Sequence, residues 1–283
     1  AFWVEQMGAK RIVAAREMSL EELKEMKKVL PPDTEIEAFV HGAMCMSYSG
    51  RCLLSNFMVG RDANRGSCTH PCRWKYSLVE EKRPGEYYPV EEDDRGSYIM
   101  NSRDLCMLDK LPDLIEAGIS SLKIEGRMKS PFYVATVVSA YRAALDAYLE
   151  DPDNYTFQEK WYKELCKASH REFYHGFYYS KPDSNGQNYS SSDYTREYSF
   201  IGVVRGYEPD SGLTIVEQRN KFCVGEDIEV FGPRTDYTDE IVREMYDENN
   251  NPIESAPHPQ QIIKVKLSKT YPSDFILRKK KES

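Results

Sequence analysis

The sequence has no long hydrophobic run, no initial methionine and no excess of positive charge. No window approaches roughly 18 consecutive apolar residues, which excludes a membrane-spanning helix, and the first residues lack the basic segment of a secretion signal. We therefore expect a cytoplasmic protein. The 46 acidic residues outnumber the 38 basic ones, for a net charge of −8. Binding to nucleic acid would therefore depend on local basic patches.

The chain also begins in the middle of an amphipathic helical pattern, so we expect it to be the C-terminal part of a longer polypeptide. Hydrophobic residues make up 40% of its 283 residues and charged residues 30%, as in ordinary globular proteins. One large domain or two ordinary domains would fit this length.

Short apolar strands alternate with helical patterns over residues 1–150, which predicts βα units and a parallel sheet. The expected strands are 11–15, 35–40 and 121–125, and the expected helices are 19–30, 105–117 and 130–149. Ser19 and Glu22 form a capping-box pattern for the first of these helices. A closed barrel needs eight strand–helix passages, so we expect the C-terminal part of a (β/α) TIM-type barrel with a cysteine-rich loop at 43–106.

The pattern changes after residue 150. Residues 151–196 read as a connector with one short helix near 158–168. Residues 197–283 alternate with a period of two between turn-forming residues, which predicts a small antiparallel β-barrel domain. Its basic end, Arg278 to Lys281, is expected to be a solvated terminus.

Five of the seven cysteines lie between Cys45 and Cys106. The odd total, without a secretion signal, argues against a disulfide framework. Six residues separate Cys45 from Cys52, more than the two to four of zinc knuckles, whereas iron–sulfur clusters accept thiolates from irregular loops. The alternative is a set of buried free thiols. That alternative is the expectation for Cys166 and Cys223.

Four segments carry a resemblance to a known family. The run from Glu37 through Cys45, Cys52 and Cys68 to Trp74 resembles the signature of peptidase family U32, the collagenase-like peptidases. The block at 122–129 (LKIEGRMK) and the segments at 216–220 and 257–260 resemble it too.

The resemblance implies hydroxylation chemistry more than proteolysis. Members of the family use prephenate to place a 5-hydroxyl on the wobble uridine of tRNA, and relatives hydroxylate a ribosomal RNA cytidine or ubiquinone precursors. Cysteine-bound iron–sulfur clusters occur among them, so the resemblance implies a cluster, expected to be 4Fe–4S. Its ligands would be Cys45, Cys52 and Cys68, with either Cys72 or Cys106 as the fourth.

Polar residues follow two expected strands at the edge where parallel barrels build their sites. His41 follows the strand at 35–40. Lys123, Glu125 and Arg127 alternate, so they would face one space, with Glu125 held between the two cations. We expect catalytic roles for His41, Glu125 and Arg127, and binding of a carboxylate such as those of prephenate by Lys123 or Lys129. A structural ion-pair network and a structural histidine are the alternatives.

A basic and aromatic stretch surrounds the cysteines. Arginine and aromatic side chains there suit phosphate contact and base stacking, and Arg51 and Arg73 are the expected substrate-binding residues. The same arginines would lower thiol pKa values and offset the charge of a cluster, which is the alternative role. The members of the stretch are Arg51, Arg61, Arg65, Arg73, Trp74, Lys75 and Tyr76.

Two other functions remain open. A U32-type peptidase would need a nucleophile or metal motif, and the chain has no H-E-x-x-H and no G-x-S-x-G. A thiol nucleophile would have to pair Cys45 with His41, or Cys72 with His70. The third candidate is a non-catalytic iron–sulfur subunit of a heteromeric hydroxylase, with a protein partner or an oligomer.

Overall fold

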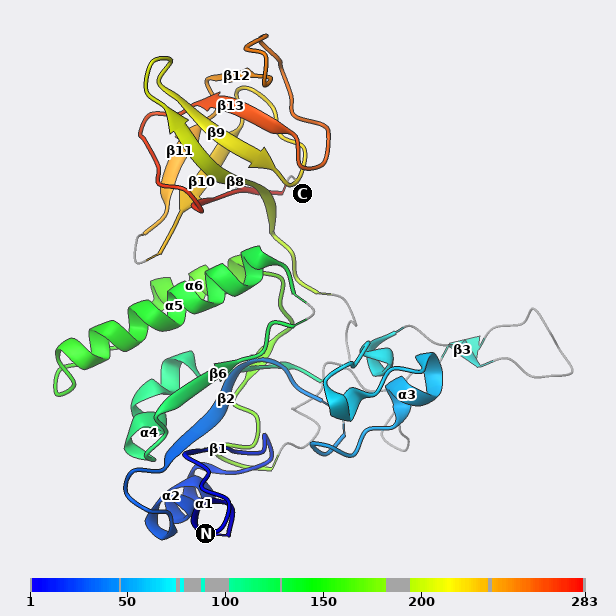
Figure 1. Cartoon of the computed structure of the whole chain (residues 1–283), viewed down its shortest axis with the longest axis vertical. Helices are drawn as coiled ribbons and strands as arrows, with labels where there is room; N and C mark the ends of the chain where they lie inside the picture. The colour runs from blue at the N-terminus through cyan, green and yellow to red at the C-terminus, as the bar shows by residue number, and fades with distance from the viewer. Residues whose placement is uncertain are drawn as a thin grey trace, which may run out of the picture. The chain divides into compact units, whose positions relative to one another are not determined.

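The computed structural model describes most of the chain. The described residues are 2–45, 47–74, 77–78, 88–89, 102–127, 129–181, 194–233 and 236–281. The chain divides into two compact units, one of Ala1–Glu125 with His170–Tyr194 and one of Gly126–Ser169 with Thr195–Ser283 (Figure 1). In this described part, no helix is both long enough and apolar enough to cross a membrane.

The first unit is built on a five-stranded mixed sheet around β2. Strand β2 pairs in parallel with β1 and β6 and antiparallel with β5, and β5 pairs in parallel with β7. The strands are β1 (Arg11–Val13), β2 (Glu35–Ala43), β5 (Asp104–Cys106), β6 (Ser121–Ile124) and β7 (Phe173–Tyr174). The three strands expected from the sequence are present and parallel. The mixed α/β class is confirmed, and the TIM-type barrel stays a prediction.

One expected helix begins too early. Leu105 and Cys106 belong to strand β5, and the helical turns start only at η3 (Leu108–Lys110) and α4 (Leu111–Glu116). A short apolar run fits a strand as well as a buried helix, and pairing with β2 decides between them here.

The other helices of the first unit are short. They are α1 (Phe2–Glu5), α2 (Leu20–Val29), α3 (Leu54–Val59), and the 3-10 turns η1 (Ala63–Arg65) and η2 (Pro71–Arg73). Helix α2 has the expected capping box, because Glu22 N donates to Ser19 Oγ and Ser19 N donates to Glu22 Oε2 at 2.8 Å. A further hairpin pairs β3 (Ser77–Leu78) with β4 (Tyr88–Pro89).

The second unit combines two helices with a seven-stranded antiparallel sheet. The helices are α5 (Pro131–Glu150), which starts at the cap Ser130, and α6 (Glu159–Lys167). The strands are β8 (Tyr198–Glu208), β9 (Leu213–Gln218), β10 (Asp227–Phe231), β11 (Thr238–Ile241), β12 (Glu244–Tyr246), β13 (Ile262–Lys266) and β14 (Ile276–Lys280). Their order is β11-β10-β14-β8-β9-β13-β12, and the sheet curls into a half-barrel (Figure 1).

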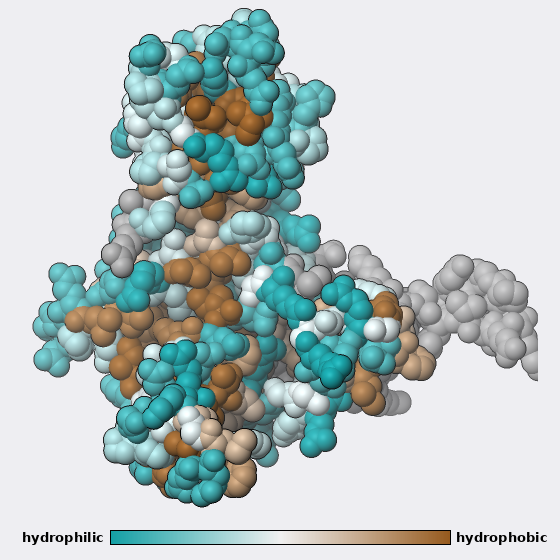
Figure 2. Space-filling view, viewed as in Figure 1, coloured by the Kyte–Doolittle hydropathy of each residue, from teal (hydrophilic) through white to brown (hydrophobic). Residues whose placement is uncertain are grey.

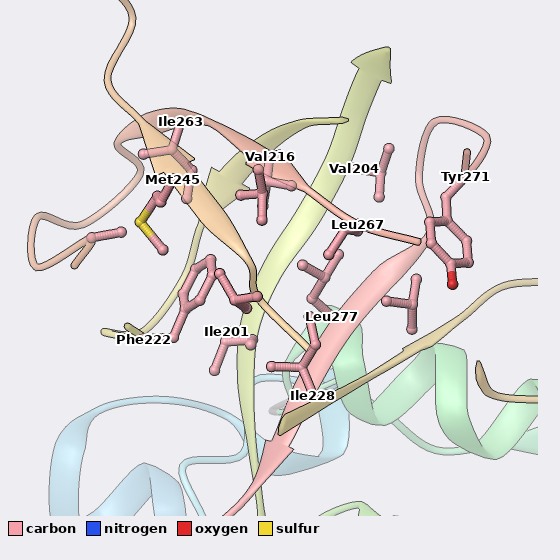
Figure 3. Packing of buried hydrophobic residues seen from close by; sticks show 14 residues of the cluster. Ile201, Val204, Val216, Phe222, Ile228, Met245, Ile263, Leu267, Tyr271 and Leu277 are labelled. Atoms are coloured by element: carbon pink, nitrogen blue, oxygen red, sulfur yellow. The ribbon is translucent and has the colours of Figure 1, made fainter. Parts of the chain in front are cut away.

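The apolar core of the second unit lies inside this curled sheet (Figure 3). Alternate residues of β9 and β13 are buried, as expected for strands with one face turned inward. Ile201, Val216, Phe222 and Ile263 are fully buried. Truncating such a side chain to alanine typically costs about 2–5 kcal/mol, so this core contributes much of the stability of the unit.

The prediction of a solvated basic terminus was wrong for Arg278, whereas Lys280 and Lys281 are exposed as expected. Residues 276–280 form β14, which lies between β10 and β8 in the sheet. Leu277 belongs to the apolar core, and the next residue, Arg278, is also fully buried, where it pairs with Glu229 and with Glu164 of α6.

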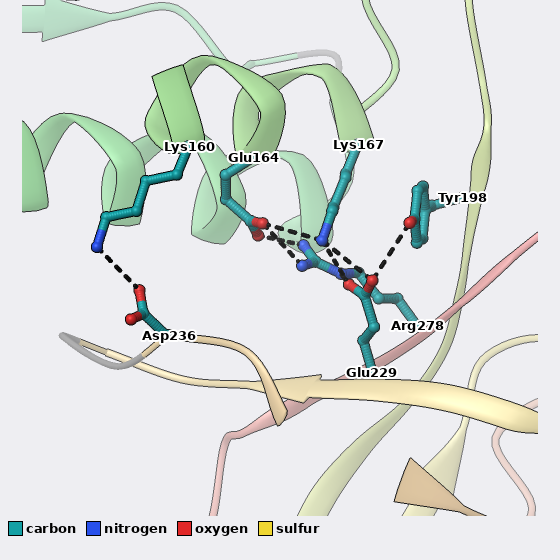
Figure 4. A network of polar contacts seen from close by, with 7 residues as sticks. All are labelled: Lys160, Glu164, Lys167, Tyr198, Glu229, Asp236 and Arg278. Atoms are coloured by element: carbon teal, nitrogen blue, oxygen red, sulfur yellow. Dashed lines mark hydrogen bonds and ion pairs between the residues drawn. The ribbon is translucent and has the colours of Figure 1, made fainter. Parts of the chain in front are cut away.

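Buried Arg278 joins an ion-pair network between α6 and the sheet (Figure 4). Its Nε donates to Glu229 Oε2 at 2.7 Å, and its Nη2 donates to Glu164 Oε2 at 2.9 Å. Lys167 Nζ lies 2.8 Å from Glu229 Oε2, and the Tyr198 hydroxyl donates to Glu229 Oε1 at 3.2 Å. Two carboxylates therefore balance two cations, which lowers the cost of burying each charge.

Candidate functional site

Strand β2 carries the first residue of the candidate site. His41 lies near its carboxyl end, is 2% exposed, and has its ring centroid 5.3 Å from that of Phe173. It stands opposite Cys106 in the register of β2 and β5. Directly opposed residues turn their side chains to the same face of a sheet, so the fold places His41 beside Cys106.

Three of the predicted cysteine ligands lie together past the end of β2. Although Cys45 is exposed as a residue, partial desolvation of its sulfur raises the pKa of its thiol, and coulombic interactions with Cys52 and Cys68 act in the same direction. The Ser47 amide and the Arg16 guanidinium act in the opposite direction. Cys45, Cys52 and Cys68 are therefore close enough to interact electrostatically.

Backbone amides point at two of these sulfurs. Ser47 N donates to Cys45 Sγ at 3.4 Å, and His70 N donates to Cys68 Sγ at 3.3 Å. His70 adopts a left-handed conformation, with φ of 57°, two residues after Cys68. Such donors stabilise the thiolate form that binds a metal.

Polar side chains hold the segments of the cysteine loop against each other. Asn64 accepts from Cys52 N at 3.1 Å and donates to Cys52 O at 2.9 Å. Ser55 Oγ accepts from Thr69 N at 3.2 Å, next to Cys68. These contacts bring the segment with Cys52 close to the segment with Cys68.

Glu17 fastens the loop to the sheet. Its Oε1 accepts from Ser49 N at 2.7 Å. Ser49 lies between Cys45 and Cys52, so this bond ties the start of the cysteine loop to the segment that follows β1.

The described side chains form no site for a single metal ion. Among the described residues, no three His, Cys, Asp or Glu side chains are placed to hold one ion. In a 4Fe–4S cluster each thiolate binds a different iron, so the four sulfurs surround a larger group. Cys72 and Cys106, the two candidates for the fourth ligand, are both buried. The five predicted ligands thus stay a prediction.

The other two cysteines lie elsewhere. Cys166 is on α6, where desolvation and then the nearby Glu197 and Glu159 raise the pKa of its thiol to about 11. Cys223 lies before β10, and its amide donates to Glu226 Oε2 at 3.1 Å. A protonated thiol on a helix fits the expectation of an ordinary packed residue.

The predicted charged residues have partners that the sequence did not indicate. Lys123 Nζ lies 3.0 Å from Glu37 Oε1 on β2. Hydrogen bonds from Lys123 and Ser121 are the main cause that lowers the pKa of Glu37 below its usual range. Glu125 Oε2 lies 3.6 Å from Arg16 Nη2. Strand β6 ends at Ile124. Of the three residues expected to alternate along this strand, only Lys123 lies in it, and Glu125 is the last of the three that belongs to the first unit.

Arg127 and Lys129 belong to the second unit. Arg127 is exposed. Lys129 Nζ donates to Ser169 O at 3.3 Å and lies 4.8 Å from the centre of the Tyr133 ring.

Arg16 is the residue of the site that the sequence analysis missed. Its Nη1 donates to Ala43 O at 3.2 Å, and its guanidinium carbon lies 4.1 Å from the centre of the Phe39 ring. It therefore connects the end of β2 with Glu125 and places its charge near Cys45. The sequence could have indicated this role, because Arg16 comes just after β1, at the same carboxyl edge of the sheet as His41.

Gly42 allows the close packing at this edge. Its φ is +121°, and a Cβ at this position would lie 2.6 Å from the carbonyl oxygen of Glu125. Only glycine combines this backbone conformation with this approach.

The basic residues of the cysteine loop lie at the surface. Arg51, Arg61 and Arg65 are exposed, and Trp74 is 44% exposed. The backbone of Arg73 lies in η2. Lys75 and Tyr76 fall outside the described residues.

Residues 1–188 match Peptidase family U32, and residues 196–278 match the Peptidase family U32 C-terminal domain. The chain belongs to peptidase family U32. The resemblance expected from the cysteine motif is thereby confirmed.

Several U32 relatives have names that describe their activity. A Bacillus subtilis (strain 168) protein named tRNA hydroxylation protein P1 is 43% identical over 280 residues, which cover 99% of this chain and 65% of the relative. The Escherichia coli (strain K12) tRNA hydroxylation protein P is 37% identical, over 82% of this chain and 59% of its own length. A Porphyromonas gingivalis (strain ATCC BAA-308 / W83) collagenase is 30% identical, over 94% and 66%. The chain thus spans about two thirds or less of these relatives.

A solved structure matches the end of this U32 chain. The crystal structure of the C-terminal domain of a Geobacillus thermoleovorans protein described as a U32 peptidase shows 36% identity, with a TM-score of 0.28. The match covers 29% of this chain and 99% of that domain.

Proposed function

We propose that this chain is part of a tRNA hydroxylation enzyme that forms 5-hydroxyuridine at the wobble position with the help of prephenate. The observation that carries the proposal is the 43% identity, over 99% of the chain, with a protein named for tRNA hydroxylation. The partial TIM-type barrel and the small β-barrel domain belong to the same proposal.

The cysteine loop is proposed to hold an iron–sulfur cluster. Cys45, Cys52 and Cys68 influence each other electrostatically and two of them accept backbone N–H bonds, which supports this assignment. The fourth ligand is Cys72 or Cys106. When bound, such a cluster supplies electron-transfer or Lewis-acid chemistry at the site.

The residues around the loop are proposed to position substrate and protons. Arg16 and the Ser47 amide offset the negative charge of the thiolates. Glu125 is about one-third exposed beside Arg16, so its Oε2 is placed to accept a proton. His41 is buried beside Cys106 and is proposed to position this thiol or to share its proton.

Cationic residues are proposed to bind the carboxylates of prephenate. Lys123 is 39% exposed at its side chain although it pairs with Glu37, so it keeps donors for a second carboxylate. Lys129 and Arg127 are the candidates from the second unit, and Arg51 and Arg73 are proposed to contact tRNA phosphates.

The proposal is tested with full-length protein purified without oxygen. Iron, acid-labile sulfide and the visible spectrum are measured for wild type and for Cys→Ser changes at Cys45, Cys52, Cys68, Cys72 and Cys106. We expect about four irons per chain, lost in four of the five variants. The changes Cys166→Ser and Cys223→Ser are the matched controls and should keep the iron. Colourless protein without iron would contradict the cluster.

The tRNA product is tested in cells. A strain lacking the protein is complemented with wild type or with a cluster-deficient variant, and 5-hydroxyuridine in its tRNA is measured by mass spectrometry. We expect 5-hydroxyuridine only with wild type, and its loss in a strain that cannot make prephenate. Normal 5-hydroxyuridine without the protein would contradict the proposal.

The collagenase relative favours peptidase as the second candidate function. The test is cleavage of gelatin by purified wild-type protein that contains no iron. Cleavage that is abolished by Cys45→Ser or Cys72→Ser would support peptidase activity over hydroxylation.

A further inference from the structure

Helix α3 presents an apolar surface to solvent next to the candidate cysteine ligands. Only Ser55 of its six residues is buried. Phe57 is 85% exposed, Leu53 is 73% exposed and Tyr48 is 71% exposed. Figure 2 shows hydrophobic atoms beside hydrophilic ones over the segment that Figure 1 labels α3. Large side chains exposed together in this way are typical of an interaction site.

The loop that carries α3 is basic. Residues 44–74 contain four arginines and a single acidic residue, Asp62, in a chain whose net charge is −8. Arg51, Arg61 and Arg65 are exposed. Within the part of the chain that the structure describes, none of these three guanidinium groups pairs with a carboxylate. Asp62 is engaged as the cap of η1, where its Oδ1 accepts from Asn64 N at 2.9 Å. The surface therefore offers positive charge to an anionic partner.

Aromatic residues and arginines follow one another along this loop, and both match the chemistry of single-stranded RNA. Bases splayed from a loop stack on aromatic side chains, while arginines contact the flanking phosphates. Protein interfaces also use aromatic rings, so the positive charge decides between the two kinds of partner. The exposed arginines favour a polyanion, and the rings of Tyr48, Phe57 and Trp74 offer stacking surfaces to unpaired bases, which a duplex keeps stacked inside. The charge and the rings together favour single-stranded RNA.

The surface is also tied to the cysteines. Leu53 directly follows Cys52, and Ser55 holds Thr69, which directly follows Cys68. Gly60 ends α3 in a left-handed conformation, with φ of 68°, and the chain then continues to Arg61. A base stacked on α3 would therefore lie on the same loop that carries Cys52 and Cys68.

We infer that the exposed face of α3 binds the unpaired loop of an RNA, with Phe57 as the base-stacking residue and Arg51, Arg61 and Arg65 as phosphate contacts. This inference rests on the proposed function, because it assigns to this surface the tRNA loop that carries the wobble uridine. Phe57 acts here as a positioning residue, which holds the loop while chemistry occurs at a neighbouring base.

The test measures RNA binding by full-length protein that contains its iron. Fluorescence anisotropy gives the Kd for two probes, an RNA hairpin with an unpaired loop and a blunt RNA duplex with the same number of phosphates. We expect Phe57→Ala to weaken hairpin binding by roughly fivefold to a hundredfold, and to leave duplex binding unchanged. Phe57→Tyr keeps the ring and should bind the hairpin within about twofold of wild type.

Two further variants separate stacking from apolar contact and from charge. Phe57→Leu keeps an apolar side chain without a ring and should bind the hairpin as weakly as Phe57→Ala. Arg61→Gln should weaken binding of both probes and reduce the salt dependence of log K by about 1. Tyr207→Ala is the matched control, since Tyr207 is an exposed aromatic residue of β8, and it should bind like wild type.

The outcomes are distinct. Wild-type affinity for the hairpin in Phe57→Ala or Phe57→Leu would overturn the inference, because base stacking on the Phe57 ring would then contribute nothing to binding. If Phe57→Ala loses its iron, Leu53→Glu tests the same face, and Leu53→Gln is its uncharged control. Wild-type affinity of Leu53→Glu for the hairpin would again overturn the inference. If wild type forms 5-hydroxyuridine while Phe57→Ala binds normally, only this inference fails. If wild type binds neither RNA and forms no 5-hydroxyuridine, the proposed function fails with it.

Discussion

Arg278 and Glu229 form a buried ion pair, with the Nε of Arg278 2.7 Å from Glu229 Oε2 and the arginine side chain fully shielded from solvent. Glu164 and Lys167 from α6 complete the balance of charge. The pair thereby connects the last strand of the sheet with a helix that precedes it in the chain.

Removal of one partner of this pair should be strongly destabilising. We expect Arg278→Met to lower the free energy of unfolding by about 3–5 kcal/mol, because Glu229 and Glu164 would remain buried without their cation. Urea unfolding followed by circular dichroism measures the loss. Arg205→Met removes an exposed arginine paired with Glu217 and should cost less than about 1 kcal/mol. Equal losses for the two variants would contradict the role of burial.

Gly42 should not tolerate a side chain. We expect Gly42→Ala to cost about 3 kcal/mol or more, because its Cβ would clash with the Glu125 carbonyl in a backbone conformation that L-residues avoid. Gly8→Ala is the matched control, since Gly8 has a φ of +71° and open space around it, and it should cost only about 1 kcal/mol. The difference between the two urea midpoints isolates the clash, and identical midpoints would rule it out.

Glu240 should make the second unit sensitive to acid. Burial favours its neutral form, but Ser268 and Tyr271 donate hydrogen bonds that outweigh burial and hold the pKa of Glu240 below its usual value. A depressed pKa contributes stability above the unfolded-state pKa of about 4.3, and this contribution is lost as the pH falls through the folded-state value.

We therefore expect Glu240→Gln to be less stable than wild type at neutral pH and to lose less stability on acidification. Urea midpoints between about pH 3 and 7 measure this dependence. The exposed Glu248→Gln is the control and should follow wild type. The prediction fails if Glu240→Gln and wild type lose stability in parallel.

Arg16 should help to retain a thiolate-bound cluster. We expect Arg16→Gln to release iron to a chelator severalfold faster than wild type, because its charge no longer offsets that of the thiolates near Cys45. Arg16→Lys keeps the charge and should give an intermediate rate, although it loses the planar contact with Phe39. Release of iron at the wild-type rate in Arg16→Gln would show that Arg16 does not help to retain the cluster.

Local patterns were enough to predict most helices and strands. The capping box at Ser19, the caps before α5 and the period-two strands of the second unit depend on neighbouring residues, so they can be read from the sequence. Strands β11 and β12 lie close together in the chain, with the buried Val242 between them. The cysteine motif was likewise sufficient to recognise the family.

Local patterns indicated most of the helices and strands, the family and the candidate ligands, whereas contacts in the folded chain set the pairings between distant segments. Cys106 became a strand residue beside His41 because β5 pairs with β2. Arg16 met Glu125 because β1 and β6 flank the same strand. The basic end of the chain became a buried strand because Glu164 and Glu229 supply its counter-charges. Such pairings depend on contacts between segments far apart in the chain, for which local periodicity carries no signal.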